Sequence, residues 1–278
     1  MMSKLYVVGT PIGNLSDLSP RAIDTLSNVD FIAAEDTRVT LKLLNKFGIK
    51  TRLESYHEHN KSERGTEILH EIMSGKSCAL VTDAGMPAIS DPGEDLVRLC
   101  REAGVEVESV PGPTAFATAM AISGMRSNRF TFEGFLSVNK KTRFEHLNSI
   151  KNEQRTMIFY EAPHKLRATL KDLYATLGDR EIAICRELTK IHEEVKRTTL
   201  SVAAKEIYEQ ARPVGEFVLI ISGKPENEEE RVYTIDEAVE IAQKYIADGM
   251  SSSNAAKAAA LDTGLKKGDI YKGLVEGE

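Results

Sequence analysis

Short apolar runs alternate with amphipathic helical stretches along the first 110 residues. Three of these runs are Leu5-Tyr6-Val7-Val8, Phe31-Ile32-Ala33-Ala34 and Cys78-Ala79-Leu80-Val81. Runs so short and so completely apolar are typical of strands buried on both faces, and a helical pattern follows each of them. Strands that recur about every 20 to 30 residues with helices between them pair in parallel through crossover connections. The pattern therefore predicts an α/β protein with a mostly parallel sheet.

The alternation changes character after Pro111-Gly112-Pro113. The residues that follow need a sheet and helices of their own, so we place a domain boundary there. We expect an N-terminal α/β domain over residues 1–113 and a C-terminal α/β domain over residues 114–226. The second domain is expected to have strands at residues 130–136, 156–160, 181–185 and 216–221, and helices at 114–123, 141–150 and 165–177, with a further helix starting at Thr198.

An acidic stretch, residues 224–230, separates these domains from a small helical extension over residues 231–278. Three helices are expected in the extension, at 235–246, 253–261 and 267–275. The last two, with Gly264 between them, resemble a helix-turn-helix. A plain helical packing unit is the alternative, and the lack of local positive charge favours it over a module that binds duplex DNA.

Composition excludes several classes of protein. The 278 residues are 41% hydrophobic and carry a formal net charge of −6, which is ordinary for a globular protein and gives no global sign of nucleic-acid binding. The three cysteines, Cys78, Cys100 and Cys185, lie in apolar or helical patterns and are expected to be core residues rather than disulfide partners. The chain shows neither a signal-peptide profile nor a membrane-length apolar run, so we expect a cytoplasmic protein.

The loop from Thr82 to Gly93 is the clearest candidate for a ligand site. It follows a buried strand, contains two Gly, two Pro and two Asp between those positions, and leads directly into a helical pattern. Loops at the carboxyl ends of strands are where α/β proteins build ligand sites. Gly85 would allow a ligand to approach the backbone, and Asp83 would supply an acceptor beside it. A surface turn of ordinary composition is the alternative.

Charged residues follow two other predicted strands. Glu35-Asp36-Thr37-Arg38 could hold a phosphate through Arg38 and orient a hydroxyl through Asp36, or could form an internal ion pair and helix cap. Arg186 and Lys190 could contact charged groups of a substrate, whereas the neighbouring His192, Glu193 and Glu194 lack metal-ligand spacing. Residues 140–171 carry eight Lys or Arg and three Glu, an excess that suits contact with an RNA backbone or a solvated helix face.

Seven loop motifs occur in order along the chain. They are Val8–Leu15, Ala34–Arg38, Thr82–Gly93, Val110–Ala115, Phe132–Leu136, Phe159–His164 and Arg186–Lys190. Together they resemble the tetrapyrrole-methylase superfamily, and within it the bacterial 16S ribosomal RNA (cytidine-2′-O)-methyltransferases, over roughly the first 225 residues. The Gly-Asp-Pro turn usual in the superfamily is replaced here by Asp83-Ala84-Gly85.

This resemblance implies the fold and the cofactor. It implies two α/β domains with S-adenosylmethionine held in the cleft between them, and a homodimer. The residues that match the superfamily's cofactor-binding motifs are Ile12, Asp83, Ala84, Gly85, Ala88, Ile89, Thr114, Ala115, Tyr160, Glu161 and Leu188.

The resemblance also implies the reaction, methylation of the 2′-oxygen of a cytidine in 16S rRNA of the small ribosomal subunit, at cytidine 1402. A ribose hydroxyl is a poor nucleophile, so an acceptor for its proton is expected. Asp36, Glu161 and Glu187 are the candidates for this role. Arg38, Arg186 and Lys190 are expected to bind RNA phosphates. Methylation of a small tetrapyrrole and a non-catalytic ribosome-binding role are the two alternatives.

Overall fold

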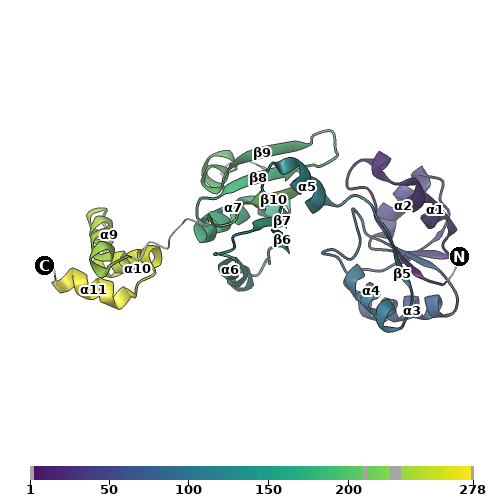
Figure 1. Ribbon diagram of the computed structural model, residues 1–278, viewed down its shortest axis with the longest axis horizontal. Coiled ribbons are helices and arrows are strands. Elements are labelled where there is room, and N and C mark those ends of the chain that lie inside the picture. The colour runs from purple at the N-terminus through teal and green to yellow at the C-terminus, as the bar shows by residue number, and fades with distance from the viewer. Residues whose placement is uncertain (1–2, 209–211, 226–232, 277–278) are drawn as a thin grey trace. The chain divides into compact units, whose positions relative to one another are not determined.

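The computed structural model describes residues 3–208, 212–225 and 233–276. Two compact units make up the chain, Met1–Lys224 and Pro225–Glu278. The first unit contains two five-stranded sheets with helices, and the second is helical (Figure 1). This arrangement confirms the predicted α/β fold class and the helical unit at the C-terminal end.

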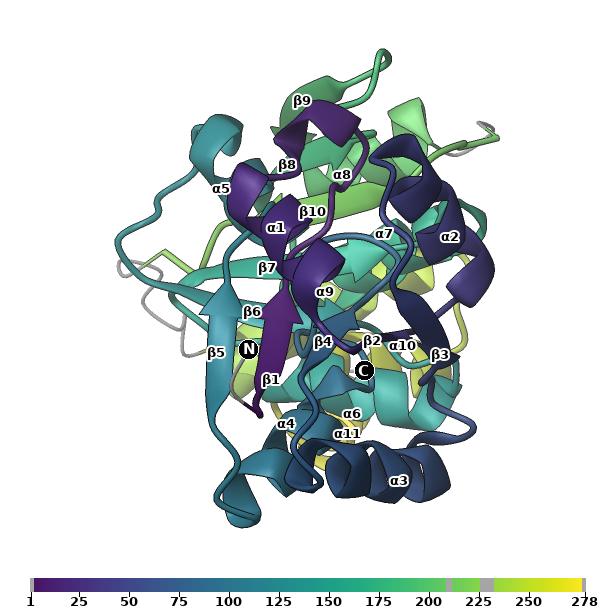
Figure 2. The same cartoon turned by 90° about the vertical axis from the view of Figure 1, so that its right-hand side faces the viewer.

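The first sheet is entirely parallel, with the strand order β3-β2-β4-β1-β5. In β1, Leu5 is paired with Cys78 of β4 on one side and with Val107 of β5 on the other. Figure 2 shows β1 and β5 side by side and running in the same direction. The strands are β1 (Leu5–Val8), β2 (Phe31–Ala34), β3 (Arg52–Ser55), β4 (Cys78–Val81) and β5 (Val107–Val110).

Helices cover both faces of this sheet because successive strand residues point to opposite sides. Tyr6 and Val8 pack in one cluster with side chains of α1 (Pro20–Asn28) and α2 (Thr37–Lys46). Leu5, which precedes Tyr6 and points to the opposite face, packs in the other cluster with side chains of α3 (Lys61–Met73) and α4 (Gly93–Glu102). A short 3-10 helix, η1 (Leu15–Asp17), precedes α1.

Helix caps set where two of these helices begin. Ser19 caps α1 by accepting from the backbone N–H of Ala22, with Pro20 at the first helical position, as the sequence predicts. Helix α2 begins at Thr37, because the Asp36 side chain accepts from the N–H of Arg38 at 2.8 Å. Asp36 is thus the helix N-cap, one of the two roles that the sequence left open for it.

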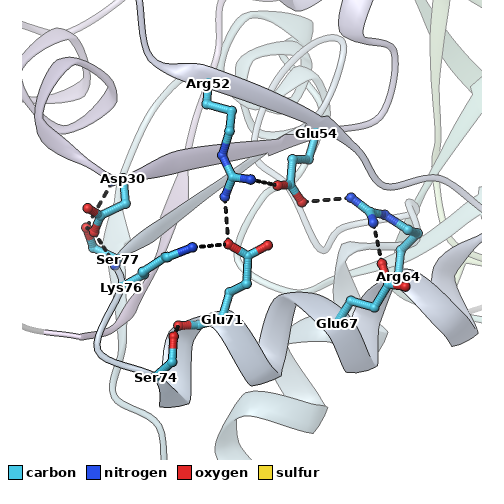
Figure 3. Close-up of polar contacts among 9 residues, drawn as sticks. All are labelled: Asp30, Arg52, Glu54, Arg64, Glu67, Glu71, Ser74, Lys76 and Ser77. Atoms are coloured by element: carbon cyan, nitrogen blue, oxygen red, sulfur yellow. Dashed lines mark hydrogen bonds and ion pairs between the residues drawn. The ribbon is translucent and has the colours of Figure 1, made fainter.

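Ion pairs line the edge strand β3. Arg52 reaches both Glu54, in the same strand, and Glu71 of α3, each at 2.6 Å (Figure 3). Glu54 also accepts from Arg64 at 2.7 Å, and Glu71 from Lys76 at 2.7 Å. Charged side chains of this kind discourage pairing of an exposed edge with another strand.

The second sheet is mixed, with the order β6-β7-β10-β8-β9. Only β6 and β7 run in parallel, and the remaining pairs are antiparallel. Strand β9 was not predicted from sequence: its residues, Glu-Val-Lys-Arg-Thr-Thr, are half-buried and mostly polar, as suits an edge strand in a hairpin with β8. The strands are β6 (Phe130–Phe135), β7 (Thr156–Glu161), β8 (Glu181–Arg186), β9 (Glu194–Thr199) and β10 (Phe217–Ile221).

Helices α5 (Ala115–Ser123), α6 (Lys140–Ser149) and α7 (Pro163–Leu177) accompany this sheet. The helix expected from Thr198 begins at Leu200 instead, because Thr198 and Thr199 belong to β9. It consists of α8 (Leu200–Val202) followed by a π-helical turn, η2 (Ala203–Ile207).

The C-terminal unit consists of α9 (Ile235–Ala247), α10 (Ser252–Thr263) and α11 (Lys267–Glu276). A capping box between Thr234 and Glu237 starts α9. Gly264 ends α10 with a positive φ of 73°, a conformation that glycine adopts without strain. The core of the unit is built from small side chains, which allow the helices to approach closely: Ala238, Ala242, Ala255, Ala256 and Ala259, with Ile270 and Leu274. Within the described residues, no helix is both long and apolar enough to cross a membrane.

Candidate active site

A cavity of about 470 Å³ lies in the first unit where loops from both sheets meet. Loops that follow β1, β2, β4 and β5 supply one wall, since parallel strands present their carboxyl ends at one edge of the sheet. The second sheet supplies the opposite wall. From the first side come Ile12, Glu35, Thr82, Ala84, Gly85, Met86, Ile89, Ser90, Asp91, Thr114 and Ala115, and from the second Phe135, Tyr160, Glu161, Ala162, Pro163, Leu188, Glu216, Phe217 and Val218.

Backbone contacts hold the first-sheet loops together. Thr10 and Gly85 exchange two backbone hydrogen bonds, at 2.9 and 3.1 Å, and the Thr10 hydroxyl donates to the Thr82 carbonyl at 3.2 Å. Gly9 and Gly112 pack so closely that a Cβ on Gly9 would lie 2.6 Å from the Cα of Gly112. The loops after β1, β4 and β5 therefore form one tightly packed floor.

The loop from Thr82 to Gly93 has an unusual backbone. Gly85 has a φ of 92°, and Ala88 and Ser90, which carry side chains, have φ values of 65°. Such conformations cost of order 1–3 kcal/mol and persist only where neighbouring contacts impose them. Asp91 supplies these contacts by accepting from the N–H groups of Ala88, Ile89 and Gly93 at 2.8, 3.2 and 2.8 Å.

Aromatic side chains join the start of α5 to the second sheet. The Tyr160 hydroxyl accepts from the backbone N–H of Phe116 at 3.1 Å, and burial raises the pKa of that phenol. The Phe132 and Phe135 rings stand edge-on to Tyr160, with centroids 5.0 and 5.4 Å away. The Thr114 side chain makes no capping bond at the start of α5, so in its first turn only the Phe116 N–H is bonded to a side chain, that of Tyr160, and Thr114 and Ala115 line the cavity.

The loop after β8 closes against the loop after β1. The Asn14 N–H donates to the Thr189 hydroxyl at 3.0 Å, and a Cβ on Gly13 would lie 2.6 Å from the Lys190 side chain. Glu187 and Thr189 have positive φ values of 51° and 64°. The Glu187 carboxylate accepts from Lys190 and from the Glu216 N–H at 2.9 and 3.0 Å, which braces this loop.

Two of the carboxylates in the cavity wall contact threonines. Glu35 accepts from the Thr82 hydroxyl at 2.5 Å and from the Asp83 N–H at 3.4 Å. Glu161 is almost fully buried; it accepts from the Ala162 N–H at 2.8 Å and, through its other oxygen, from the Thr169 hydroxyl. The wall thus combines apolar side chains with carboxylates, a lining that suits a cationic ligand with apolar parts.

A smaller hollow, of about 220 Å³, adjoins the cavity at Thr82, which lines both. Its other lining residues come from the loop after β1, from η1, from α2 and from Asp83. Burial and the neighbouring charge of Glu35 raise the pKa of Asp83.

Comparison with known proteins identifies the family. The sequence model described as Tetrapyrrole (Corrin/Porphyrin) Methylases matches residues 4–204. The chain belongs to the tetrapyrrole methylase family. Relatives named ribosomal RNA small subunit methyltransferase I include proteins from Synechocystis sp., 46% identical with 98% of this chain and 97% of the relative covered, and from Bacillus subtilis, 47% identical with 97% and 93% covered. A Thermotoga maritima relative of that name is 49% identical, with all of the relative but only 80% of this chain covered.

Solved structures show the same fold at low sequence identity. A cobalt precorrin-4 methyltransferase superimposes with a TM-score of 0.59 and 17% identity, with 79% of this chain and 95% of that chain covered. A diphthine synthase superimposes with a TM-score of 0.60 and 14% identity, with 79% and 89% covered.

The structure gathers most of the cofactor-binding residues predicted for a tetrapyrrole methylase around the larger cavity. Asp83 and Ala88 do not line it: Asp83 lines the smaller hollow, and the Ala88 N–H is held by Asp91. The predicted residues that line the larger cavity are Ile12, Ala84, Gly85, Ile89, Thr114, Ala115, Tyr160, Glu161 and Leu188.

The three carboxylates predicted to be catalytic occupy different environments. Glu161 lines the cavity, whereas Asp36 and Glu187 are not among its lining residues. Hydrogen bonds from Arg38 lower the pKa of Asp36 to about 2. The bond from Lys190 likewise lowers the pKa of Glu187.

The predicted RNA-binding cations lie outside the cavity lining. Arg38 pairs with Asp36 at 2.6 Å and leaves 87% of its side chain exposed. Arg186 donates to the Val214 carbonyl at 3.0 Å, and Lys190 pairs with Glu187 and Glu216.

Part of the basic segment over residues 140–171 is structural. Arg143 is buried and pairs with Asp172 at 2.6 Å, and Arg155 pairs with Glu153 at 2.7 Å. Arg143 thus joins α6 to α7, and Arg155 is neutralised by a neighbour in its own loop, so the excess positive charge available to a partner is smaller than the sequence suggests.

Several lining residues were not predicted. Glu35 carried a signal, since it directly follows a strand in a loop already singled out, yet within that loop only Asp36 and Arg38 were given roles. Phe217 and Val218 carried no such signal, because their sequence pattern is that of interior residues of a strand. Among the described residues, no group of three or more His, Cys, Asp or Glu side chains could hold a metal ion.

Proposed function

We propose that this chain is an S-adenosylmethionine-dependent methyltransferase that modifies the ribose 2′-oxygen of a cytidine in 16S rRNA, at cytidine 1402. Relatives that cover nearly the whole chain at 46–47% identity carry names of small-subunit rRNA methyltransferases. The observation that carries the proposal is the cavity at the strand ends, which the tetrapyrrole methylase fold builds from both sheets.

The residues of the cavity fit the proposed methyl donor. A volume of about 470 Å³ falls within the range usual for small-ligand sites, about 300–1,000 Å³. A sulfonium and an ammonium group require negative charge nearby, which Glu35 and Glu161 provide. The donor's carboxylate suits the N-terminal end of α5, where backbone N–H groups and the helix dipole favour an anion. Gly85, with no side chain, leaves room between Ile12 and the Pro113 carbonyl.

Bound S-adenosylmethionine would supply an activated methyl group. The protein then has mainly to align the acceptor oxygen with that group, an effect that can contribute roughly 7–11 kcal/mol. The braced loops serve this purpose. Asp91 fixes the backbone of the Thr82–Gly93 loop, and the bond between Asn14 and Thr189 fixes the distance between the two cavity walls.

Among the carboxylates, Glu35 is best placed to accept the proton of the ribose hydroxyl. Both of its hydrogen bonds fall on one oxygen, Oε2, whereas both oxygens of Glu161 already accept bonds. A pKa of about 2 makes Asp36 a weak base. Replacement of Glu35 by Gln should lower the single-turnover methylation rate by about 100-fold or more, with the affinity for the donor measured alongside.

A direct assay tests the proposal. Small ribosomal subunits from a strain that lacks this protein are incubated with the purified chain and radiolabelled S-adenosylmethionine, and the modified nucleotide is mapped. Label at the 2′-oxygen of one cytidine is the expected result. Label on a corrinoid precursor but not on subunits would favour the small-tetrapyrrole alternative. Absence of donor binding in calorimetry would favour a non-catalytic role.

A further inference from the structure

The smaller hollow adjoins the larger cavity, here called the donor cavity, and its lining has the chemistry of a nucleobase site. Pro11, Leu15, Val39 and Leu43 supply an apolar lining, and Asp83 supplies a carboxyl group. Leu15 and Val39 are 43% and 40% exposed, so part of this apolar lining is open to a ligand. Thr10, Thr40, Lys42 and Thr82 complete the lining. Apolar surface beside a few polar groups is how proteins commonly hold a flat heteroaromatic ring.

We propose that this hollow, between α2, η1 and the loop after β1, is the subsite that receives the base of the acceptor nucleotide. The proposal rests on the proposed function and adds to it the place where the acceptor is recognised. It also assigns Asp83 to the acceptor rather than to the methyl donor.

The position of the hollow fits this role because it adjoins the donor cavity. Thr82 lines both spaces, and its hydroxyl donates to Glu35, which lines the donor cavity. A base in the hollow therefore brings its own ribose toward the junction at Thr82 and Glu35. The ribose hydroxyl, the proton acceptor and the methyl donor would then meet at one point.

Asp83 can distinguish cytosine from uracil. One of its oxygens accepts from the Asp36 N–H at 3.1 Å, which orients the carboxyl group and leaves the second oxygen for a ligand. Carboxylates accept hydrogen bonds from the exocyclic amino group of cytosine, whereas uracil presents a carbonyl oxygen at that position. The Asp83 carboxyl group therefore favours cytosine, whose amino group donates a hydrogen bond, over uracil.

Positive charge at the rim suits the phosphates that flank a nucleotide in a chain. Lys42 lines the hollow, is exposed, and makes no ion pair with any side chain in the described part of the protein. Arg38, one turn earlier on the same helix, has 87% of its side chain exposed. Arg38 shares its charge with Asp36, so Lys42 is the stronger candidate for contact with a phosphate, which an RNA strand has and an isolated base lacks.

A bulky residue on α2 tests the assignment. Val39→Trp fills the hollow, and Leu41→Trp is the matched control, because Leu41 lies two residues away on the same helix, is 49% exposed and does not line the hollow. Val39→Trp should lower kcat/KM for ribosomal subunits by about 100-fold and leave the affinity for S-adenosylmethionine unchanged. Leu41→Trp should behave as wild type in both measurements.

Base preference gives a second readout that does not depend on how Val39→Trp folds. Subunits that carry cytidine or uridine at the acceptor position are methylated in parallel. Asp83→Asn can present its amide N–H₂ to uracil, so the preference for cytidine over uridine should fall by about tenfold or more relative to wild type.

The outcomes separate the two proposals. A wild-type protein that does not methylate subunits overturns the proposed function. An active wild type with normal kcat/KM in Val39→Trp, or an unaltered base preference in Asp83→Asn, overturns the assignment of the hollow and leaves the methyltransferase intact. Weaker donor binding in a folded Val39→Trp would also overturn it, because the hollow would then belong to the donor site.

Discussion

Replacement of Thr169 by Val should destabilise the protein through one buried hydroxyl. Thr169 is fully buried on α7; its hydroxyl donates to the Glu161 carboxylate and accepts from Arg143 at 3.3 Å. Valine has nearly the same shape, so packing is preserved and the change isolates the hydrogen bonds. Arg143 keeps its ion pair with Asp172, whereas one Glu161 oxygen is left buried without a partner.

The expected cost follows from that unpaired oxygen. A buried polar group without a partner costs about 1–3 kcal/mol, and more where it is charged, so we expect a loss of about 2–3 kcal/mol in the free energy of unfolding. With a urea m-value near 3 kcal/mol/M, the unfolding midpoint should fall by about 1 M. Urea titration followed by far-ultraviolet circular dichroism measures this shift. Glu161 lines the cavity, so donor affinity, measured by calorimetry, should fall as well.

Thr66→Val is the matched control. Its hydroxyl donates at 3.2 Å to the Ser62 carbonyl within α3, on an exposed face, so its loss should change stability by less than about 0.5 kcal/mol. If Thr169→Val unfolds at the same urea concentration as wild type, the bond to Glu161 contributes nothing. The reasoning about the buried carboxylate would then be refuted.

Three further predictions concern packing, pH and the C-terminal unit. Gly9→Ala should cost about 1–3 kcal/mol in thermal or urea unfolding, because its Cβ would lie 2.6 Å from the backbone of Gly112; unchanged stability would mean that the loops can separate freely. The Arg155 side chain lowers the pKa of Glu153 from 4.5 to about 2, so this pair stabilises the protein above pH 4.5 and its contribution is lost as the pH falls through 2. Arg155→Met should therefore make the free energy of unfolding depend less on pH in that window. An unchanged pH dependence would contradict the role given to Arg155. Removal of residues 225–278 should leave donor affinity in calorimetry unchanged, because the described lining of the cavity ends at Val218; weaker binding would show that the helices contribute to the site.

The positions of the site loops could be predicted from sequence, whereas the direction of single side chains could not. Apolar runs marked the strands at Leu5–Val8, Phe31–Ala34 and Cys78–Val81, and in a parallel sheet the loops that follow such strands lie at one edge. Which residue of a loop faces inward depends on local backbone geometry. Glu35 faces the cavity, whereas the next residue, Asp36, turns away to cap α2.

Other features depend on distant contacts that leave no local pattern. Strand β9 pairs with β8 although polar and apolar residues do not alternate along it. It lies at the edge of the sheet and pairs with one buried strand only, so this alternation is not required. The positive φ angles of Ala88 and Glu187 are imposed by hydrogen bonds around them, and neither residue type signals such a conformation. Seven motifs in order indicated the family, because a shared ancestor retains many such details together.

The order of strands in the first sheet bears on how the chain folds as it is synthesised. Strand β1 is synthesised before both of its partners, β4 and β5, which begin at Cys78 and Val107. At about 5–20 residues per second, roughly 4 to 15 seconds of translation separate β1 from β4. During that interval the apolar side chains of β1 have neither neighbouring strand to pair with, so this part of the sheet forms only after β4 and β5 have been synthesised.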